Sequence, residues 1–331
     1  MREKPLTLCK YFAEMRFSRP YLILLLAGCL LAGCRRDGYA VFTGYAQGGT
    51  YTVKADLTGV AVPKEEIAAR IGAILDSIDF SLSGYNKSSL LSRFNAGGQI
   101  VPDRFFTEVR ALSEKYRAQT GGAFDAASAP LFDIWGFGFT ADSLPDPARI
   151  QAALLACKEE KVLNFNAIAQ GYTCDVVADY LHSIGVHNML VDIGEIFCEG
   201  LNPSGQGWTI GVDNPVDGND TPGQDIRGIW QSDGGACGIV TSGNYRKFYV
   251  KDGRKYAHTI DPRTGYPVEH GLLSATVVAP TAAEADALAT ACMVLGPDDA
   301  KALILSRPEL EAYLITDTGT WTSDGFKLRL P

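Results

Sequence analysis

The sequence predicts a mixed α+β fold, because segments with two different hydrophobic periods follow one another along the chain. Over residues 248–257, apolar side chains alternate with polar ones, which is typical of strands half buried in a sheet. After Pro63, isoleucines and a leucine recur at the helical period. With 331 residues, of which 46% are hydrophobic and 21% charged, the chain can bury a substantial core, as one large domain or two closely joined ones.

The first stretch of the chain is expected to be a secretion signal rather than part of the fold. The strongly apolar run Tyr21–Ala32 follows two arginines and ends on small residues. It is shorter than the ~20 residues that a membrane-spanning helix needs, and its flanks are typical of a signal peptide. An uncleaved anchor helix is the alternative. In either case the folded part is expected outside the cytoplasm.

Two cysteines in this stretch end the sequence LAGC, which resembles the bacterial lipobox, where the cysteine is lipidated and becomes the first residue. We expect Cys34 to be that residue, because Cys29 would leave a shorter apolar segment. The predicted organisation is a signal over 1–33, a polar linker over 34–46 and one folded domain over 47–331. A lipid on Cys34 would anchor the protein to a bacterial cell membrane, facing the periplasm.

The charge and the cysteines exclude some classes of function. The net charge is −8 and no basic block is present, so the electrostatic footprint of nucleic-acid binding is missing. An acidic protein that handles an anionic substrate needs local positive charge or a metal. Five cysteines follow Cys34, and no two have C-x-x-C spacing, which argues against a zinc site. Buried free thiols are the simplest interpretation, and one disulfide is the alternative.

Between residues 47 and 122 we expect a strand and two helices. The strand starts at Gln47 and is entered through two glycines, which let the backbone approach a neighbour or a ligand closely. A polar loop centred on Tyr85 separates the two helices, and the second helix runs over about 105–119 until two glycines stop it. The first helix has these residues on one face: Ile67, Ile71, Ile74, Leu75 and Ile78.

The middle of the chain is less regular. Segment 122–138 is aromatic and broken by glycine, so we expect no clean element there, and Asp125 and Asp133 have a capping role as the simple alternative. Segment 164–185 opens on a loop and is predicted to become a helix from about Gly171. A helix N-terminus offers N–H groups and a favourable dipole to phosphate, although this signal is weak by itself. The remaining predictions are strands over 189–193, 208–212, 272–279, 312–315 and 326–330 and a short helix over 298–305.

A predicted hairpin carries the densest group of polar side chains. The dipeptide Asp252-Gly253 favours a tight hairpin turn, and the second strand runs into His258 and the turn DPRTG at 261–265. Proline and glycine make this turn rigid, so it presents histidine, aspartate, arginine and threonine side chains together. Such a group suits an anionic ligand, and a decorated surface hairpin is the alternative.

The predicted helix over 282–295 is small or apolar at nearly every position, so it must be buried on most sides. Within it, Asp286 and Thr290 are four residues apart and share a face. A buried carboxylate is costly unless it pairs with a cation or loses its charge, and no lysine or arginine lies within one turn. Carboxylate and hydroxyl oxygens suit Mg²⁺, while a hydrogen bond to backbone or a distant arginine is the alternative.

Several motifs in order resemble the ApbE family, the FAD:protein FMN transferases, from about Gly48 to Gly296. The resemblance implies a mixed, largely antiparallel α+β fold. It is carried by these strings: GTY, the Tyr85 loop, AFD at 123–125, WGFG, AIAQGY, TSGNYRKF, HTIDPRTGYPV and EADALATA.

The resemblance also implies a reaction and a site. Enzymes of this family cleave FAD at the pyrophosphate, attach FMN to a threonine or serine of a target protein, commonly a subunit of a membrane redox pump, and release AMP with the help of Mg²⁺. The implied metal ligands are the Ala167 carbonyl and the side chains of Asp286 and Thr290, and Asp286 and His258 are the implied catalytic residues. The implied FAD contacts are Gly48, Tyr85, Ala123, Phe124, Asp125, Asn164, Gln170 and His258.

Three departures from the family pattern stand beside these matches. Gln170 replaces a frequent lysine, Asn164 replaces a frequent aspartate, and a single glycine, Gly194, precedes Glu195 where Gly-Gly-Glu is usual. The metal ligands and the His258 motif are intact, so we expect activity. Two alternatives stay open: a Mg²⁺-dependent pyrophosphatase that releases FMN and AMP, and a lipoprotein that only binds FAD.

Overall fold

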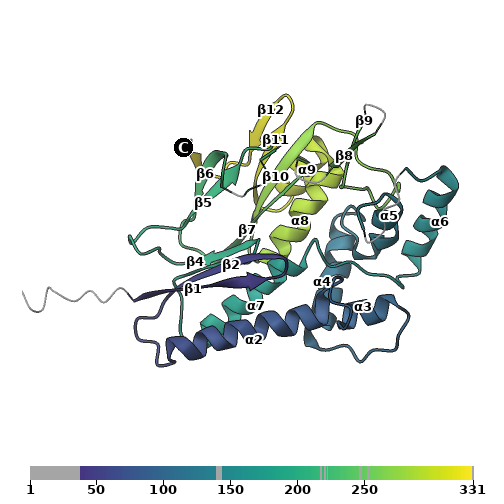
Figure 1. Cartoon of the computed structure of the whole chain (residues 1–331). Helices are drawn as coiled ribbons and strands as arrows, with labels where there is room; N and C mark the ends of the chain where they lie inside the picture. The colour runs from purple at the N-terminus through teal and green to yellow at the C-terminus, as the bar shows by residue number, and fades with distance from the viewer. Residues whose placement is uncertain are drawn as a thin grey trace, which may run out of the picture. The chain divides into compact units, whose positions relative to one another are not determined.

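The computed structural model describes residues 38–138, 144–216, 218–219, 221, 223–245, 248–251 and 254–329. Residues 39–331 form one unit, built on an eight-stranded sheet (Figure 1). All strand pairs among the described residues are antiparallel. The order in the large sheet is β1 (Tyr39–Ala46), β2 (Gly49–Asp56), β3 (Met189–Asp192), β4 (Ile196–Glu199), β7 (Cys237–Gly243), β10 (Leu272–Ala279), β11 (Glu311–Thr316) and β12 (Gly319–Thr322).

Two smaller sheets complete the strands. One has the order β13 (Leu328–Arg329), β6 (Ile226–Gln231) and β5 (Thr209–Asp213), and the other is the hairpin of β8 (Phe248–Lys251) and β9 (Arg254–Ala257). The helices are α2 (Lys64–Leu82), α3 (Leu90–Asn95), α4 (Arg104–Gln119), η2 (Ala126–Ser128), α5 (Ala129–Ile134), α6 (Pro147–Lys158), α7 (Ala169–Ser183), α8 (Ala282–Leu295) and α9 (Pro297–Leu305). Among the described residues, no helix combines the length and the apolar character that a membrane span requires.

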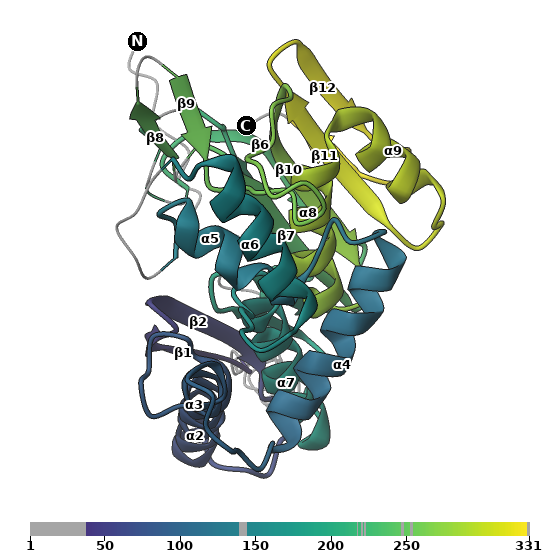
Figure 2. The same cartoon turned by 90° about the vertical axis from the view of Figure 1, so that its right-hand side faces the viewer.

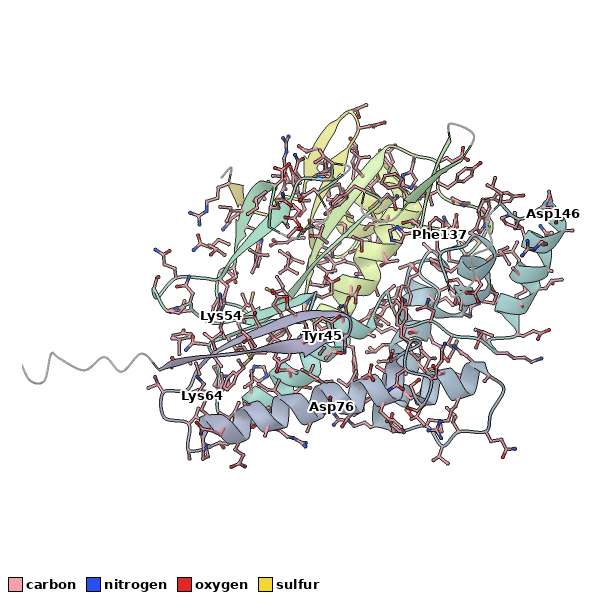
Figure 3. All side chains as sticks on the ribbon, in the orientation of Figure 1. Tyr45, Lys54, Lys64, Asp76, Phe137 and Asp146 are labelled. Atoms are coloured by element: carbon pink, nitrogen blue, oxygen red, sulfur yellow. The ribbon has the colours of Figure 1, made fainter. Side chains whose placement is uncertain are left out.

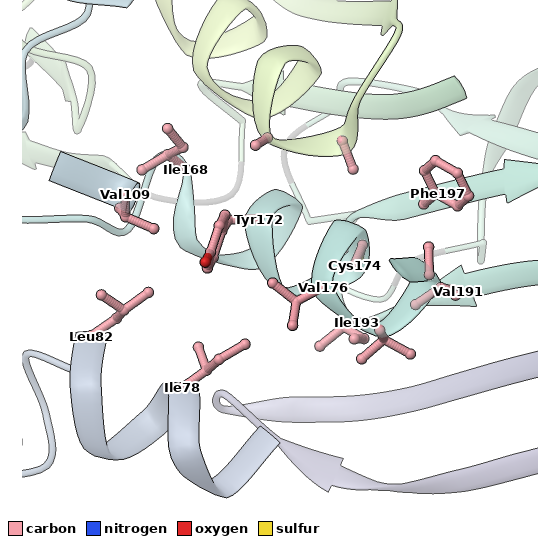
Figure 4. Close-up of a cluster of buried hydrophobic side chains, with 14 of the residues drawn as sticks. Ile78, Leu82, Val109, Ile168, Tyr172, Cys174, Val176, Val191, Ile193 and Phe197 are labelled. Atoms are coloured by element: carbon pink, nitrogen blue, oxygen red, sulfur yellow. The ribbon is translucent and has the colours of Figure 1, made fainter. Parts of the chain in front are cut away.

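The two faces of the large sheet are covered by different layers, as the alternation of side chains along β3 shows. Met189 and Val191 belong to the core formed with α2, α4, α7 and α8, whereas Leu190 belongs to a core shared with the small β5–β6–β13 sheet. Figure 4 shows part of the first core, in which Ile78 and Leu82 of α2 point towards α7. Helices therefore cover one face, and the small sheet covers the other.

A separate hydrophobic core lies between α5, α6 and the segment that follows the β8–β9 hairpin. Helices α5 and α6 lie side by side (Figure 2), and Leu131, Trp135 and Ile150 pack there with Ile260, which follows β9. Segment 122–138, expected to be irregular, thus contains η2 and α5. Asp125 caps η2 with its side chain, which accepts the N–H of Ala127 at 2.8 Å, so the capping role given as the alternative is observed at Asp125.

The structure confirms most of the predicted elements and corrects others. The helix after Pro63 is α2, with Ile67, Ile71, Ile74, Leu75 and Ile78 buried. Thr281 caps α8, and β10 and α8 have the predicted bounds. Residues 39–46, expected as a linker, form β1 instead, because they pair with β2 in full register and bury Ala40 and Phe42.

Other predictions differ in smaller ways. Helix α7 begins at Ala169, two residues before the predicted start, and β13 is shorter than expected. The five cysteines after Cys34 are all free thiols, as expected. The signal segment 1–33, Cys34 and the turn Asp252-Gly253 lie outside the described residues.

Candidate functional site

The candidate site is centred on the crossing of α7 and α8, where the two backbones touch. A Cβ atom added to Gly171 would lie 2.3 Å from the carbonyl oxygen of Ala282, so only glycine allows this approach. On another side of α8, a Cβ added to Gly238 of β7 would lie 2.3 Å from the Cα of Ala282. The N-terminal turn of α8 is therefore wedged between a helix and a strand.

Asp286 lies one turn further along α8 and is only 4% exposed. Its Oδ2 atom accepts the N–H of Gly171 at 3.1 Å, and no ion pair with a described residue neutralises it. Burial raises the pKa of Asp286 to about 7; the Gly171 hydrogen bond opposes this rise, and the charge of Asp175 adds to it. The carboxyl group is thus held in place by a backbone hydrogen bond, with no cation beside it among the described residues.

A second carboxylate, the half-buried Asp175 of α7, lies at the start of α8. Its two oxygens accept the N–H groups of Ala282 at 2.8 Å and of Ala283 at 2.9 Å. Burial raises the pKa of Asp175 to about 7, while these two hydrogen bonds oppose the rise. Because the N-terminal end of a helix favours negative charge, Asp175 fastens α7 to α8. No local pattern in the sequence predicts this role of Asp175, since its partners are 107 and 108 positions away.

Hydroxyl groups complete this part of the site. Thr290 follows Asp286 by one turn of α8, and its Oγ1 atom lies 3.5 Å from the Oγ of Ser242 on β7. Ser242 belongs to the motif TSGNYRKF and was not singled out as a site residue. Ala167 lies in the loop that leads into α7, where Phe165 accepts hydrogen bonds from the N–H groups of Ile168 and Ala169. This loop carries both the Ala167 carbonyl and Asn164.

The β1–β2 turn joins the same region from the other side. Gln47 donates to Thr173 Oγ1 on α7 at 2.6 Å, and the next residue, Gly48, has a φ of 85°. The Oε1 atom of Gln47 is buried and has no hydrogen-bond partner among the described residues. A hollow of about 440 Å³ lies between this hairpin and α2, and Figure 3 labels Tyr45 and Asp76, two residues of its lining.

The AFD motif lies next to the loop of Asn164. The N–H of Asn164 donates to the Ala126 carbonyl at 2.8 Å, and Ala123 and Phe124 are buried. The Oδ2 atom of Asp125 lies 3.2 Å from Nε of Arg117. Burial raises the pKa of Asp125, and the N–H of Ala127 and the charge of Arg117 oppose the rise. Asp125 is therefore a capping residue, and the structure brings the AFD motif together with Asn164.

His258 follows β9 and lies beside the aromatic segment that follows α5. Its ring is 6.3 Å from that of Phe137, edge to face, and Trp135 stacks near Tyr256 at 6.0 Å. The indole N–H of Trp135 also donates to the Gly265 carbonyl at 2.8 Å. The WGFG segment thus fixes the strand before His258 and the turn after it.

The structure brings some predicted residues together more closely than others. Asp286 contacts the first turn of α7 through Gly171, whereas Thr290, one turn further along α8, contacts Ser242 of β7. Asn164 pairs with the segment that follows the AFD motif, and the loop that carries Asn164 and Ala167 leads into α7. Tyr85 lies on the loop between α2 and α3 with 67% of its surface exposed. Two departures from the family pattern touch: a Cβ added to Gly194 would lie 2.6 Å from Nε2 of Gln170.

Comparisons with known proteins identify the family of this chain. A family model described as the ApbE family matches residues 48–314. The FAD:protein FMN transferase of Escherichia coli K12 is 31% identical over 351 residues, covering 95% of this chain and 97% of the relative. That of Vibrio cholerae is 33% identical over 333 residues, covering 93% and 96%.

Solved structures show the same likeness. The apo form of the flavinyl transferase ApbE from Pseudomonas stutzeri superposes with a TM-score of 0.74 at 34% identity, covering 86% of this chain and 95% of that one. The flavin transferase ApbE from Vibrio cholerae gives a TM-score of 0.71 at 30% identity, with 88% and 96% covered. With the family model matching most of its length, the chain belongs to the ApbE family.

Proposed function

We propose that this protein is a Mg²⁺-dependent transferase that moves FMN from FAD to a threonine or serine hydroxyl of a target protein and releases AMP. The relatives named above as FAD:protein FMN transferases support the reaction. The observation in the structure that carries the proposal is Asp286, a buried carboxylate one helical turn before Thr290 with no cation beside it among the described residues.

The residues around Asp286 fit a magnesium ion. Mg²⁺ prefers oxygen ligands and is commonly held by one or two carboxylates together with substrate phosphates. Asp286 and Thr290 would supply side-chain oxygens, and Ala167 would supply its carbonyl. When bound, the ion would neutralise negative charge on the pyrophosphate oxygens. It would also supply the positive charge that a chain of net charge −8 needs beside an anionic substrate.

The first turn of α7 would hold the phosphates. The N-cap residue of α7, Ile168, provides no side-chain cap, and the positive end of a helix dipole favours anions. Gln170, in that turn, replaces a lysine that many family members have. Its side-chain amide would therefore donate a hydrogen bond to the phosphates where a lysine would supply a positive charge. Gly48, Tyr85, Asn164 and the AFD motif would bind the rest of FAD.

His258 would act on the target hydroxyl or on the flavin phosphate. A neutral imidazole can accept a proton from a hydroxyl group, and its ordinary pKa lies near neutrality. The rigid turn after β9 and the contact with Phe137 would orient the ring. Replacement by asparagine keeps a hydrogen-bonding group but removes the base. We therefore expect His258→Asn to lose transfer; undiminished transfer would remove His258 from the mechanism.

The deciding experiment combines a peptide acceptor with a metal-site variant. The soluble domain, Arg35 to Pro331, is incubated with FAD, Mg²⁺ and a peptide that bears a threonine acceptor, and peptide mass and nucleotides are followed. An FMN-sized mass gain with AMP release, lost in Asp286→Ala, is the expected result. FMN and AMP with an unmodified peptide would indicate a pyrophosphatase, and intact FAD throughout would indicate binding alone, with the departures at Gln170 and Gly194 as the suspected causes.

We also propose where the enzyme works. Lipidation of Cys34 would hold it at the outer face of the cell membrane, within reach of flavin-carrying subunits of membrane redox pumps. The test is a Cys34→Ser variant of the full chain, expressed in a bacterial host. Loss of the protein from the membrane fraction and of the mass added by the lipid is expected; unchanged membrane association would contradict the anchor.

A further inference from the structure

A second cluster of metal-ligating side chains lies at the other end of α7. His182 is in the last turn of this helix, His187 lies in the loop before β3, and Glu199 ends β4. One ligand atom from each lies within 4.8 Å of the other two. His182 Nε2 contacts Glu199 Oε2, and His187 Nδ1 lies 3.7 Å from Glu199 Oε1. Two imidazoles thus face the two oxygens of one carboxylate.

The backbone that carries these groups is well supported. Met189 and Glu199 are register partners in the β3–β4 ladder, and the Glu199 carbonyl accepts the indole N–H of Trp208 at 2.8 Å. After it, Gly200 has a φ of 68°, and a Cβ there would lie 2.4 Å from the His187 carbonyl oxygen. Strand pairing and this close approach hold two of the three ligands in place, which is what a preformed site needs.

The donor set points to a transition metal rather than to Mg²⁺. Two imidazole nitrogens and one carboxylate are a known zinc ligand set, with the fourth position left to water or another ligand. Imidazole suits zinc and its neighbours, whereas Mg²⁺ prefers oxygen. The side chain of Glu199 is 20% exposed and that of His187 is 70% exposed, so the group is open to solvent on one side. The C-terminal end of a helix also favours positive charge.

We propose that His182, His187 and Glu199 form a binding site for a divalent transition cation of the zinc class, separate from the proposed magnesium site. His182 is eleven residues beyond Gly171 on the same helix, which corresponds to about 16 Å along α7. The two sites would therefore stand at opposite ends of one helix and take cations of different chemistry. The cation would join α7 to β4 and to the loop before β3.

The test is zinc binding to the metal-stripped protein in the presence of excess Mg²⁺, which fills oxygen-only sites. Calorimetric titration of the wild type should give one zinc site per chain. His187→Ala changes the most exposed ligand and is expected to fold normally. It should weaken zinc binding at least about tenfold, because even the partners of metal ligands contribute that much. Glu199→Gln should do the same, whereas Glu114→Gln, on the exposed face of α4, should not.

A second measurement distinguishes coordination by these three residues from nonspecific zinc binding. Co²⁺ bound to two histidines and a carboxylate gives visible absorption bands of low coordination number, and His187→Ala should remove them. Flavin transfer by His187→Ala with Mg²⁺ should equal that of the wild type, since the cluster lies away from the proposed site. Zinc binding of equal strength in His187→Ala, or its absence in the wild type, would overturn the proposal and leave a surface His–Glu hydrogen bond.

Discussion

Replacement of Asp286 by asparagine should stabilise the metal-free protein at alkaline pH and abolish its response to Mg²⁺. The structure gives the magnitude: the pKa of the buried carboxyl rises from 3.8 to about 7. Each unit of difference corresponds to about 1.4 kcal/mol, so ionised Asp286 costs up to about 4 kcal/mol. The native state holds its proton more tightly than the unfolded chain, so this cost develops as pH rises from about 4 to about 7. Asparagine remains neutral and can still accept the Gly171 N–H.

The assay is thermal unfolding of the two proteins at pH 4 and pH 8, with a chelator or with Mg²⁺. At pH 4 both should be similar, and at pH 8 with chelator the variant should be more stable, by about 10 °C in Tm for a chain of this size. Saturating Mg²⁺ should stabilise only the wild type, by about 2.7 kcal/mol at a hundredfold excess over Kd. Asp298→Asn, at a side chain that is 93% exposed, is the matched control. A variant less stable than the wild type at pH 8 without metal would refute the reasoning.

Three further outcomes are expected. Gly171→Ala should destabilise the protein by about 1–3 kcal/mol, because the new methyl group meets the Ala282 carbonyl; thermal unfolding measures this, and an unchanged Tm would contradict the close approach. Gln170→Lys should tighten FAD binding about tenfold through a charged hydrogen bond, as measured by quenching of flavin fluorescence; weaker binding would contradict a favourable contact between residue 170 and the phosphates. In a native domain starting at Arg35, a thiol reagent should label Cys237 first, since the other four thiols are buried; faster labelling at another cysteine would contradict this burial.

The sequence predicted those parts of the fold whose signals are local. Helix α8 has a capping residue, Thr281, and an almost unbroken apolar content, so its bounds and its burial followed directly. The burial of Asp286 could be predicted in the same way, since its neighbours on the helix are small and apolar. Strand β1 was mistaken for a linker because only Ala40 and Phe42 of its eight residues are fully buried.

The parts that escaped prediction depend on contacts between distant segments. Asp175 looks like an ordinary polar position of α7 until the start of α8 is placed against it. Likewise, the hydrogen bond from Gly171 to Asp286 spans 115 positions. The contact between Gln170 and Gly194 was equally hidden, although each was noticed alone as a departure from the family pattern. Spacing along the chain carries no information about such pairs.

The double contact at Ala282 has a consequence for how this enzyme can change over time. Main chain meets main chain there on two sides, at Gly171 and at Gly238, with no side chain between them. A backbone contact of this kind involves no side-chain rotamers. The distance between the two backbones therefore does not depend on which apolar residues pack in the surrounding core. Substitutions elsewhere can accumulate while the spacing between the first turn of α7 and the acidic residue of α8 stays the same. This chain shares about a third of its residues with two of its relatives, and a contact made by main chain alone is one that substitution on this scale can leave unchanged.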